Sequence, residues 1–298
     1  MNYSACNINN ANHYQFLGTP FIPFFKMQGC GNDFVLIDNR ELQVPVTAMA
    51  DWARAVCPRA IAVGADGLIF LERTEPGHAA DYRWHFYNAD GSRAEMCGNA
   101  SRCAARLAVW LGLAGPEHVL DTDAGPIRVR VAVDSDVVRV QLTDYTDLNL
   151  STCLRLHNQD FVVHFVNTGV PHALVLLEST ADLATLDIKT YGPALRQHQY
   201  FNPEGINANF GYVTDYKNIL LRTFERGVEG ETLACGTGAA AAVVIGHALG
   251  LTDTHVAVTT SGGEIMNIIV KNLTTYIEGR AVLVYVGQIL LTTLGLSL

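Results

Sequence analysis

Two cysteines in this chain stand directly before a glycine at the start of a predicted helix. Cys97 precedes Gly98, and Cys235 precedes the Gly-Thr-Gly turn that begins at Gly236. A thiol at a helix N-terminus lies beside unpaired backbone N–H groups and the positive end of the helix dipole, which stabilise the thiolate and lower the thiol pKa. The same N–H groups can bind an anion such as a carboxylate. Each position is therefore a candidate acid/base group beside a candidate carboxylate site.

An internal repeat relates the two thiols. Placing Phe86 over Phe224, a constant offset of 138, gives ten identities over 42 positions, among them Cys97 with Cys235. A single cysteine at a helix start is more often structural than catalytic, but duplication of the Cys-Gly pair favours catalysis. In the repeat, Cys103 is aligned with Ala241 and so has no cysteine counterpart, and it is expected to be structural.

Two similar acid/base groups on opposite faces of one substrate suit the inversion of a stereocentre. One group, as thiolate, removes the proton from one face, and the other, as thiol, returns a proton to the opposite face. The α-proton of an amino acid is weakly acidic, so charge that develops on the carboxylate needs stabilisation. Two helix N-termini aimed at that carboxylate would supply it.

The two copies of the repeat predict the same elements. A short strand, WHFYN or LLRTFER, leads through a turn to a helix of about four turns, ASRCAARLAVWL or AAAAVVIGHAL. Both helices are small or apolar nearly all round, as expected inside a sheet, and Gly112 and Gly250 suit left-handed helix ends. Further strands are predicted at the segments IRVRVAV, VVRVQL, EIMNIIV, YIEG, DFVLID, GLIFLE, FVVHFVN and ALVLLE.

We therefore predict an α+β fold of two pseudo-symmetric domains, each a mostly antiparallel curled sheet or barrel around a central helix, with the active site in the cleft between them. Residues 1–22 are expected to form a polar N-terminal extension. Residues 23–142 with 281–298 would form the domain of Cys97, and residues 143–280 that of Cys235. The linker is expected near Thr143 to Ser151, and the last strand, AVLVYVGQILL, to return to the first domain.

The net charge, the apolar runs and the cysteine spacing reduce the number of possible function classes. The net charge of −9 argues against nucleic acid as the main partner. No apolar run reaches the ~18 residues of a membrane span, and the N-terminus does not resemble a signal peptide, so we expect a cytoplasmic protein. The seven cysteines include no C-x-x-C pair, which weakens a zinc ribbon or a thioredoxin-like site.

Several longer motifs resemble the diaminopimelate epimerase family. They are FFKMQGCGNDFVLID, FYNADGSRAEMCGNASRC, VNTGVPHALV, GINANFGYV and RTFERGVEGETLACGTGAAAA, and they occur in the family's order. The resemblance covers the chain from Phe24 to its end. It implies a cofactor-independent, metal-free cytoplasmic homodimer that interconverts L,L- and meso-2,6-diaminopimelate on the route to lysine and peptidoglycan. The expected partner is this small-molecule substrate, with no nucleic acid and no membrane.

The resemblance also implies roles for individual residues. Cys97 and Cys235 match the catalytic thiol pair, with Cys97 the base on the L centre. Backbone groups for the reacting carboxylate would come from Gly98, Asn99, Gly236 and Thr237. The far end of the substrate would meet Asn32, Asn88, Asn207 and Arg226, with Glu225 near the reacting amino group. Arginine is the natural bidentate partner of a carboxylate. Without the family context, Glu225 and Arg226 also suit a plain surface ion pair.

Four further positions are possible site-lining residues. His172 matches a histidine that lines the family site, although a buried, backbone-bonded histidine is an equal alternative. Ala100 replaces a common glycine, Val170 a common asparagine, and Gly67 a common glutamine of the family. We expect these three departures from the family pattern to affect substrate specificity and not the two-thiol chemistry.

Other functions are weighed against this one. The nearest is a racemase or epimerase of the same fold that acts on another amino acid. GTGAAA matches a weak form of the dinucleotide fingerprint, so a nicotinamide-dependent oxidoreductase is a remote alternative, but the string comes late and mostly strands follow it. A thiol switch through a disulfide between Cys97 and Cys235 is a third. None of the four lysines has the context of a pyridoxal phosphate site.

Overall fold

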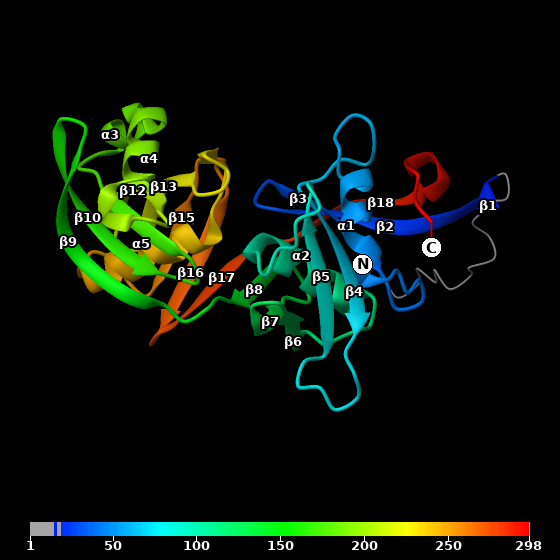
Figure 1. Ribbon diagram of the computed structural model, residues 1–298. Coiled ribbons are helices and arrows are strands. Elements are labelled where there is room, and N and C mark those ends of the chain that lie inside the picture. Colours follow the sequence, from blue (N-terminus) through cyan, green and yellow to red (C-terminus); the bar gives the residue numbers. More distant parts are fainter. Residues whose placement is uncertain (1–14, 17–18, 298) are drawn as a thin grey trace. The chain divides into compact units, whose positions relative to one another are not determined.

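The computed structural model describes residues 15–16 and 19–297 (Figure 1). The chain divides into two compact units, unit 1 with residues up to Val140 and Arg280–Leu298, and unit 2 with Gln141–Gly279. Each unit combines a mostly antiparallel sheet with a few helices, so the predicted α+β class is confirmed. Within the described residues, no helix is long and apolar enough to cross a membrane.

Unit 1 has one sheet in the order β18-β2-β3-β4-β5-β6-β7-β8, in which only β3–β4 and β5–β6 are parallel. Its elements are β1 (Gln15–Phe16), β2 (Thr19–Gly29), β3 (Asn32–Asp38), α1 (Val46–Val56), β4 (Gly67–Arg73), β5 (Tyr82–Asn88), α2 (Gly98–Trp110), β6 (Glu117–Thr122), β7 (Gly125–Val131), β8 (Val137–Gln141), β18 (Val282–Leu290) and the 3₁₀ turn η2 (Leu291–Leu294).

Two helices cover the sheet of unit 1. α1 packs Trp52 against Phe70 of β4, in a cluster that also holds Val35 of β3. Because successive side chains of a strand point to opposite faces, the neighbours of these strand residues face the other side, where α2 contacts the same two strands. The middles of β3 and β4 are therefore buried on both faces, and both consist of a short apolar run, FVLI in β3 and LIFL in β4.

Unit 2 has a sheet in the order β9-β10-β11-β12-β13-β15-β16-β17, with β14 paired to β13. Its elements are β9 (Thr146–Leu156), β10 (Gln159–Asn167), β11 (Pro171–Leu176), α3 (Thr180–Thr185), α4 (Ile188–Arg196), the 3₁₀ turn η1 (Gln199–Phe201), β12 (Asn207–Asp215), β13 (Asn218–Glu225), β14 (Gly230–Thr232), α5 (Gly236–Ala248), β15 (His255–Thr259), β16 (Ile265–Lys271) and β17 (Thr274–Arg280). Only β11–β12 and β13–β15 pair in parallel.

α2 and α5 follow the repeat closely. They begin at Gly98 and Gly236 and have 13 residues each, so both their starts and their ends lie 138 positions apart. Gly112 and Gly250, just after the helix ends, have φ values of 66° and 74°, as predicted for left-handed caps. Both helices are buried on most sides because their small residues let several strands approach, β2, β3, β4 and β7 for α2 and β10–β13 and β16 for α5.

The last strand completes the sheet of unit 1. β18 pairs with β2, from Val282 opposite Gln28 to Leu290 opposite Phe21, and the two run side by side in Figure 1. In unit 2 the strand beside the corresponding β10 is β9, which comes first in that unit. The final residues of the chain thus supply unit 1 with the strand that β9 supplies to unit 2.

Two expectations about connecting segments need correction. Most of the expected linker, from Thr146 on, is strand β9, because its backbone pairs with β10 even where its side chains are polar and exposed. Of the expected N-terminal extension, residues 19–22 already belong to β2, which pairs with Gln15–Phe16. The rest of it, residues 1–14 and 17–18, lies outside the described residues.

Candidate active site

Cys97 occupies the N-cap position of α2. Its backbone is extended, with φ −150° and ψ 122°, and its carbonyl accepts the first helical hydrogen bond from the Ser101 N–H, 2.8 Å away. The N–H groups of Gly98, Asn99 and Ala100 therefore precede the helical bonding pattern and have no partner within the helix. The thiol is half-buried. This half-site places a thiol beside three backbone donors, as an anion site requires.

Side-chain amides extend from this helix start to the beginning of β3. Asn99 Nδ2 donates to Asn32 Oδ1 at 2.6 Å, and Asn32 Nδ2 donates to Asp66 Oδ2 at 3.0 Å. At the other end, Arg102 Nη2 donates to Asn99 Oδ1 at 2.8 Å. Arg102 is completely buried, and nothing in the sequence singles it out beyond its place in a helix with many small residues. Two predicted site residues, Asn32 and Asn99, are thus in direct contact.

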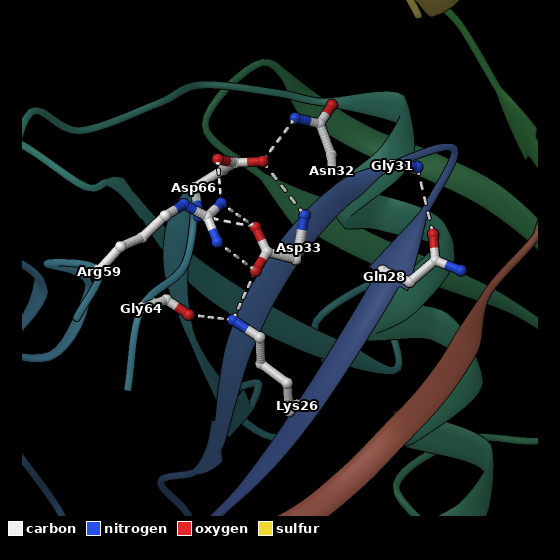
Figure 2. A network of polar contacts seen from close by, with 8 residues as sticks. All are labelled: Lys26, Gln28, Gly31, Asn32, Asp33, Arg59, Gly64 and Asp66. Carbon is white, nitrogen blue, oxygen red and sulfur yellow. Dashed lines mark hydrogen bonds and ion pairs between the residues drawn. The ribbon is translucent and has the colours of Figure 1, made fainter. Parts of the chain in front are cut away.

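A charged network supports Asn32 (Figure 2). Asp66 accepts from Arg59 at 2.8 Å, and Asp33 accepts from Arg59 at 2.5 Å and from Lys26 at 2.7 Å. Burial alone would raise the pKa of Asp33, but the hydrogen bonds and charges of Arg59 and Lys26 outweigh it and lower the pKa to about 2. Asp33 therefore stays ionised at neutral pH, and the strand start that carries Asn32 is held by ion pairs.

Cys235 is the N-cap of α5 and matches Cys97 in backbone geometry, with φ −125° and ψ 111°. Its carbonyl accepts from the Ala239 N–H at 2.9 Å, which leaves the N–H groups of Gly236, Thr237 and Gly238 without helical partners. The Cys235 side is more buried than the Cys97 side, with 7% of the residue exposed. Its Sγ lies 3.5 Å from Thr237 Oγ1.

His172 links this thiol to the sheet through side chains. Asn209 Nδ2 lies 3.1 Å from His172 Nδ1 and also donates to the Ala173 carbonyl, which fixes the orientation of the amide. His172 Nδ1 is therefore the acceptor, and Nε2 carries the proton and donates to Thr237 Oγ1 at 2.9 Å. The Thr237 hydroxyl hydrogen is then available to the Cys235 sulfur, an arrangement that favours thiolate.

Burial keeps this histidine neutral. His172 has no exposed surface, and its burial, with the charge of Arg226 as a second cause, lowers its pKa to about 3. The sequence left open whether His172 lines the site or is a backbone-bonded core residue. It is buried, but the bonds of its ring go to Asn209 and Thr237 side chains, one of which is a predicted substrate-binding residue. Asn209, a fully buried polar residue of β12, is a part of this arrangement that sequence reasoning missed.

Asn207, Glu225 and Arg226 lie together at the adjoining ends of β12 and β13. Asn207 Oδ1 accepts from the Arg226 backbone N–H at 2.8 Å. The guanidinium of Arg226 reaches only the carbonyls of Glu204 and Gly205, at 3.4 and 3.5 Å, and no carboxylate among the described residues. The surface ion pair with Glu225 is thus not formed. Burial raises the pKa of Glu225.

The remaining predicted residues of unit 1 lie at β4 and β5 and within α2. Asn88 ends β5 opposite Gly67, is exposed, and donates to Ser92 Oγ at 3.0 Å. A Cβ at Gly67 would stand 2.6 Å from the Phe86 ring and 2.8 Å from the Tyr87 carbonyl. Packing therefore accounts for the glycine at this position. Ala100 is completely buried.

Two other positions bear on the thiols. Val170, in the turn before β11, is half-buried, and its carbonyl accepts from the Thr168 N–H. The Thr168 hydroxyl in turn donates to the Thr237 carbonyl at 2.9 Å, which ties this turn to the start of α5. Cys103 is fully buried, and burial raises its pKa to about 12, so it is a structural thiol.

Comparison with known proteins identifies the family. The family model for diaminopimelate epimerase matches residues 24–147 and 164–284. A diaminopimelate epimerase from Hydrogenobaculum sp. is 41% identical over 273 residues, which is 89% of this chain and 97% of the relative. One from Aquifex aeolicus is 41% identical over 252 residues, 82% of this chain and 88% of the relative.

Solved structures share the fold at low sequence identity. A phenazine biosynthesis protein of the PhzF family from Bacillus anthracis has a TM-score of 0.68 at 14% identity and covers 91% of this chain and 99% of its own. A probable proline racemase from Agrobacterium radiobacter K84 has a TM-score of 0.66 at 16% identity, with 93% and 96% covered. The family model and the curated relatives go further than the fold: this chain belongs to the diaminopimelate epimerase family and is an isomerase of the racemase and epimerase class.

Proposed function

We propose that this protein interconverts L,L- and meso-2,6-diaminopimelate by two-base proton transfer between Cys97 and Cys235, without pyridoxal phosphate or a metal. The observation that carries the proposal is the matched pair of N-cap cysteines, at equivalent positions of α2 and α5. Each has unpaired helix N–H groups beside it for the substrate carboxylate.

The chemistry balances without another reactant. The thiolate takes the α-proton, the electron pair of the C–H bond passes to the α-carbon and its carboxylate, and the second thiol gives its proton to the opposite face. The backbone donors of Gly98, Asn99, Gly236 and Thr237 would stabilise the negative charge on the carboxylate. In the direction where Cys235 is the base, the Thr237 hydroxyl would stabilise its thiolate.

The far end of the substrate is proposed to bind through Arg226, Asn32, Asn88 and Asn207. Arg226 has only two long contacts to carbonyl oxygens, so its guanidinium has donors left for a carboxylate. The Asn207 side chain holds the Arg226 backbone. Glu225 would meet the reacting amino group.

A second candidate is the epimerisation of another amino acid by the same thiols. Val170 favours it, because this chain has an aliphatic side chain at the position where the family resemblance implies an asparagine for the distal group. A panel of amino acids with polar and apolar distal ends separates the two candidates.

The primary test is proton NMR of the pyridoxal-free protein with L,L-diaminopimelate in D2O and reductant. Loss of one α-proton signal with growth of the meso isomer is expected. Cys97→Ser and Cys235→Ser should nearly abolish turnover and leave the melting temperature unchanged, while Cys153→Ser, at an exposed cysteine, should change neither. Full activity in either active-site variant contradicts the mechanism.

We extend the proposal to the family's setting. Membership supports a cytoplasmic homodimer that acts in lysine and peptidoglycan-precursor synthesis, and the two compact units serve as the two catalytic domains. Sedimentation of the purified protein at micromolar concentration tests the dimer.

A further inference from the structure

Four side chains of unit 1 form a continuous chain of hydrogen bonds from Asp66, just before β4, to α2. Arg102 donates to Asn99 at 2.8 Å, Asn99 donates to Asn32 at 2.6 Å, and Asn32 donates to Asp66 at 3.0 Å. The two amides lie in the middle, and an ionised group of opposite charge stands at each end. None of these contacts is local in sequence except that between Asn99 and Arg102, one turn apart on α2.

The charged ends determine how both amides are oriented. A carboxylate only accepts hydrogen bonds and a guanidinium only donates them. Asn32 must therefore turn its NH₂ group to Asp66 and its carbonyl to Asn99, and Asn99 must turn its NH₂ to Asn32 and its carbonyl to Arg102. Reversing either amide would place two donors or two acceptors against each other in a partly buried place, which is unfavourable.

This orientation decides what Asn32 offers to a ligand. One hydrogen of its Nδ2 goes to Asp66, and within the described part of the chain the second has no other recorded partner. Asn32 is only partly buried, so this N–H can reach a ligand. An N–H donor of this kind suits a carboxylate and is unsuited to an ammonium group.

We propose that Asp66 and Arg102 are positioning residues that fix Asn32 as a donor to the distal carboxylate of the substrate. This inference rests on the proposed function. It assigns the Asn32 contact to the carboxylate of the distal group, and it joins that contact to the first turn of α2 through Asn99, two residues after Cys97.

Asp66 is suited to this role because both of its oxygens are already committed. Oδ1 accepts from Arg59 at 2.8 Å, while Oδ2 accepts from Asn32 and from the Asp33 N–H at 3.2 Å (Figure 2). In Asp66→Asn, an NH₂ group must face either Arg59 or Asn32. The variant therefore removes the charge that orients Asn32 at nearly unchanged side-chain volume, and 40% exposure of the Asp66 side chain makes the change compatible with folding.

The test compares three ligands that differ only at the distal end. They are diaminopimelate, 2-aminopimelate, which keeps the distal carboxylate but lacks the distal amine, and lysine, which keeps the amine but lacks the carboxylate. In Asp66→Asn we expect the KM of diaminopimelate and the inhibition constant of 2-aminopimelate to rise about tenfold, the loss typical of one hydrogen bond to a charged group. The inhibition constant of lysine should change less than about twofold, and kcat should fall less than KM rises.

A matched control and a second variant complete the experiment. Asp51→Asn removes a carboxylate from an exposed ion pair with Arg54 on α1 and should leave all three constants unchanged. If Asp66→Asn does not fold, Asp66→Ser, which removes the carboxylate acceptor of Asn32 without adding an amide, should give the same selective loss.

The outcomes separate this inference from the proposed function. An active wild type whose Asp66→Asn variant keeps its KM, or loses lysine and 2-aminopimelate affinity equally, overturns the positioning role and leaves the function standing. A folded wild type that neither binds nor epimerises diaminopimelate overturns both.

Discussion

At the scale of single residues, the Thr237 hydroxyl connects the neutral His172 ring to the Cys235 sulfur. Thr237→Val keeps the shape of the side chain and the backbone N–H but removes the hydroxyl. We expect kcat/KM to fall about tenfold or more, because the thiolate loses a hydrogen bond to its charged form. Loss of that bond also raises the thiol pKa, so the acid limb of the pH profile of kcat/KM should move to higher pH.

Thr237→Ser is the matched control for this prediction. It retains the hydroxyl, so activity and the acid limb should stay close to those of the wild type. A Thr237→Val enzyme with an unshifted acid limb would show that the hydroxyl does not act on the thiolate.

A second residue-scale prediction concerns Gly67. Replacing it with glutamine should destabilise unit 1 by about 1–3 kcal/mol, the usual cost of overpacking. The added Cβ would meet the Phe86 ring and the Tyr87 carbonyl, and the carbonyl belongs to the sheet backbone and cannot give way cheaply. Urea unfolding followed by tryptophan fluorescence measures the change. Gly77→Ala, at a turn with open space around it, controls for general loss of glycine, although its own positive φ carries a smaller strain.

The residues of the site differ in how far the sequence could predict them. Cys97, Cys235 and Thr237 follow from the repeat and from the family motifs. The roles of Asp66 and Arg102 cannot be predicted in this way, because they depend on contacts between residues that are far apart in the sequence. Asn32 contacts Asp66, which is 34 positions away, and Asn99, which is 67 positions away. A buried arginine among small helix residues is a signal that a buried polar partner exists, but it does not say which partner.

At the scale of elements, the start of α5 packs so closely on β12 that only glycine fits at position 238. A Cβ there would stand 2.6 Å from Asn209 Oδ1. Asn209 cannot move freely, because it holds His172, Ala173 and Thr223 through hydrogen bonds. We expect Gly238→Ala to displace this amide and lower kcat/KM at least about tenfold, since a small misplacement of a catalytic group is costly.

Gly230→Ala, on β14, is the control, because its Cβ would meet nothing within 4 Å. Wild-type activity in Gly238→Ala would contradict the close packing.

This packing also gives the GTGAAA string a structural reason unrelated to dinucleotides. Along the chain, α5 does come between β13 and β15, which pair in parallel. The strands that follow are antiparallel, unlike those of a doubly wound sheet.

The predictability of the elements follows their local signals. α2, α5 and their left-handed ends were predicted because the repeat shows each of them twice. α1 is not among the predicted elements, although its buried residues Met49, Trp52, Ala53 and Val56 follow helical spacing. α4 contains Pro193, which argues against a helix locally. The linker prediction near β9 is wrong because the side chains of this segment are polar and exposed, as in a loop, whereas its backbone pairs with β10 as a strand.

At the scale of the whole molecule, the two units can be observed separately. All three tryptophans, Trp52, Trp84 and Trp110, belong to unit 1, so tryptophan fluorescence reports on that unit alone. Far-UV circular dichroism reports on both units. A chain with two compact units need not unfold in a single transition.

His172 predicts that acid will destabilise unit 2. Its pKa is about 3 in the folded unit because of burial, against 6.5 ordinarily, so between these values the unfolded chain binds a proton that the folded unit does not. Stability must therefore fall as the pH falls from 6.5 towards 3. In unit 1, the lowered pKa of Asp33 means that its ion pairs are lost only as the pH falls below 3.8 towards 2.

We therefore expect circular dichroism to change at higher pH than tryptophan fluorescence during acid titration. His172→Gln, which cannot take up the proton, should reduce this separation. His118→Gln, at a buried histidine of unit 1 whose pKa is also lowered by burial, should not. Glu225 opposes the effect, because burial raises the pKa of its carboxyl group and protonation by acid therefore stabilises unit 2. Glu225 is present in the wild type and in both variants, so its contribution cancels in the comparison. Coincident transitions in the wild type, or an unchanged separation in His172→Gln, would show that this buried ring does not set the acid limit of its unit.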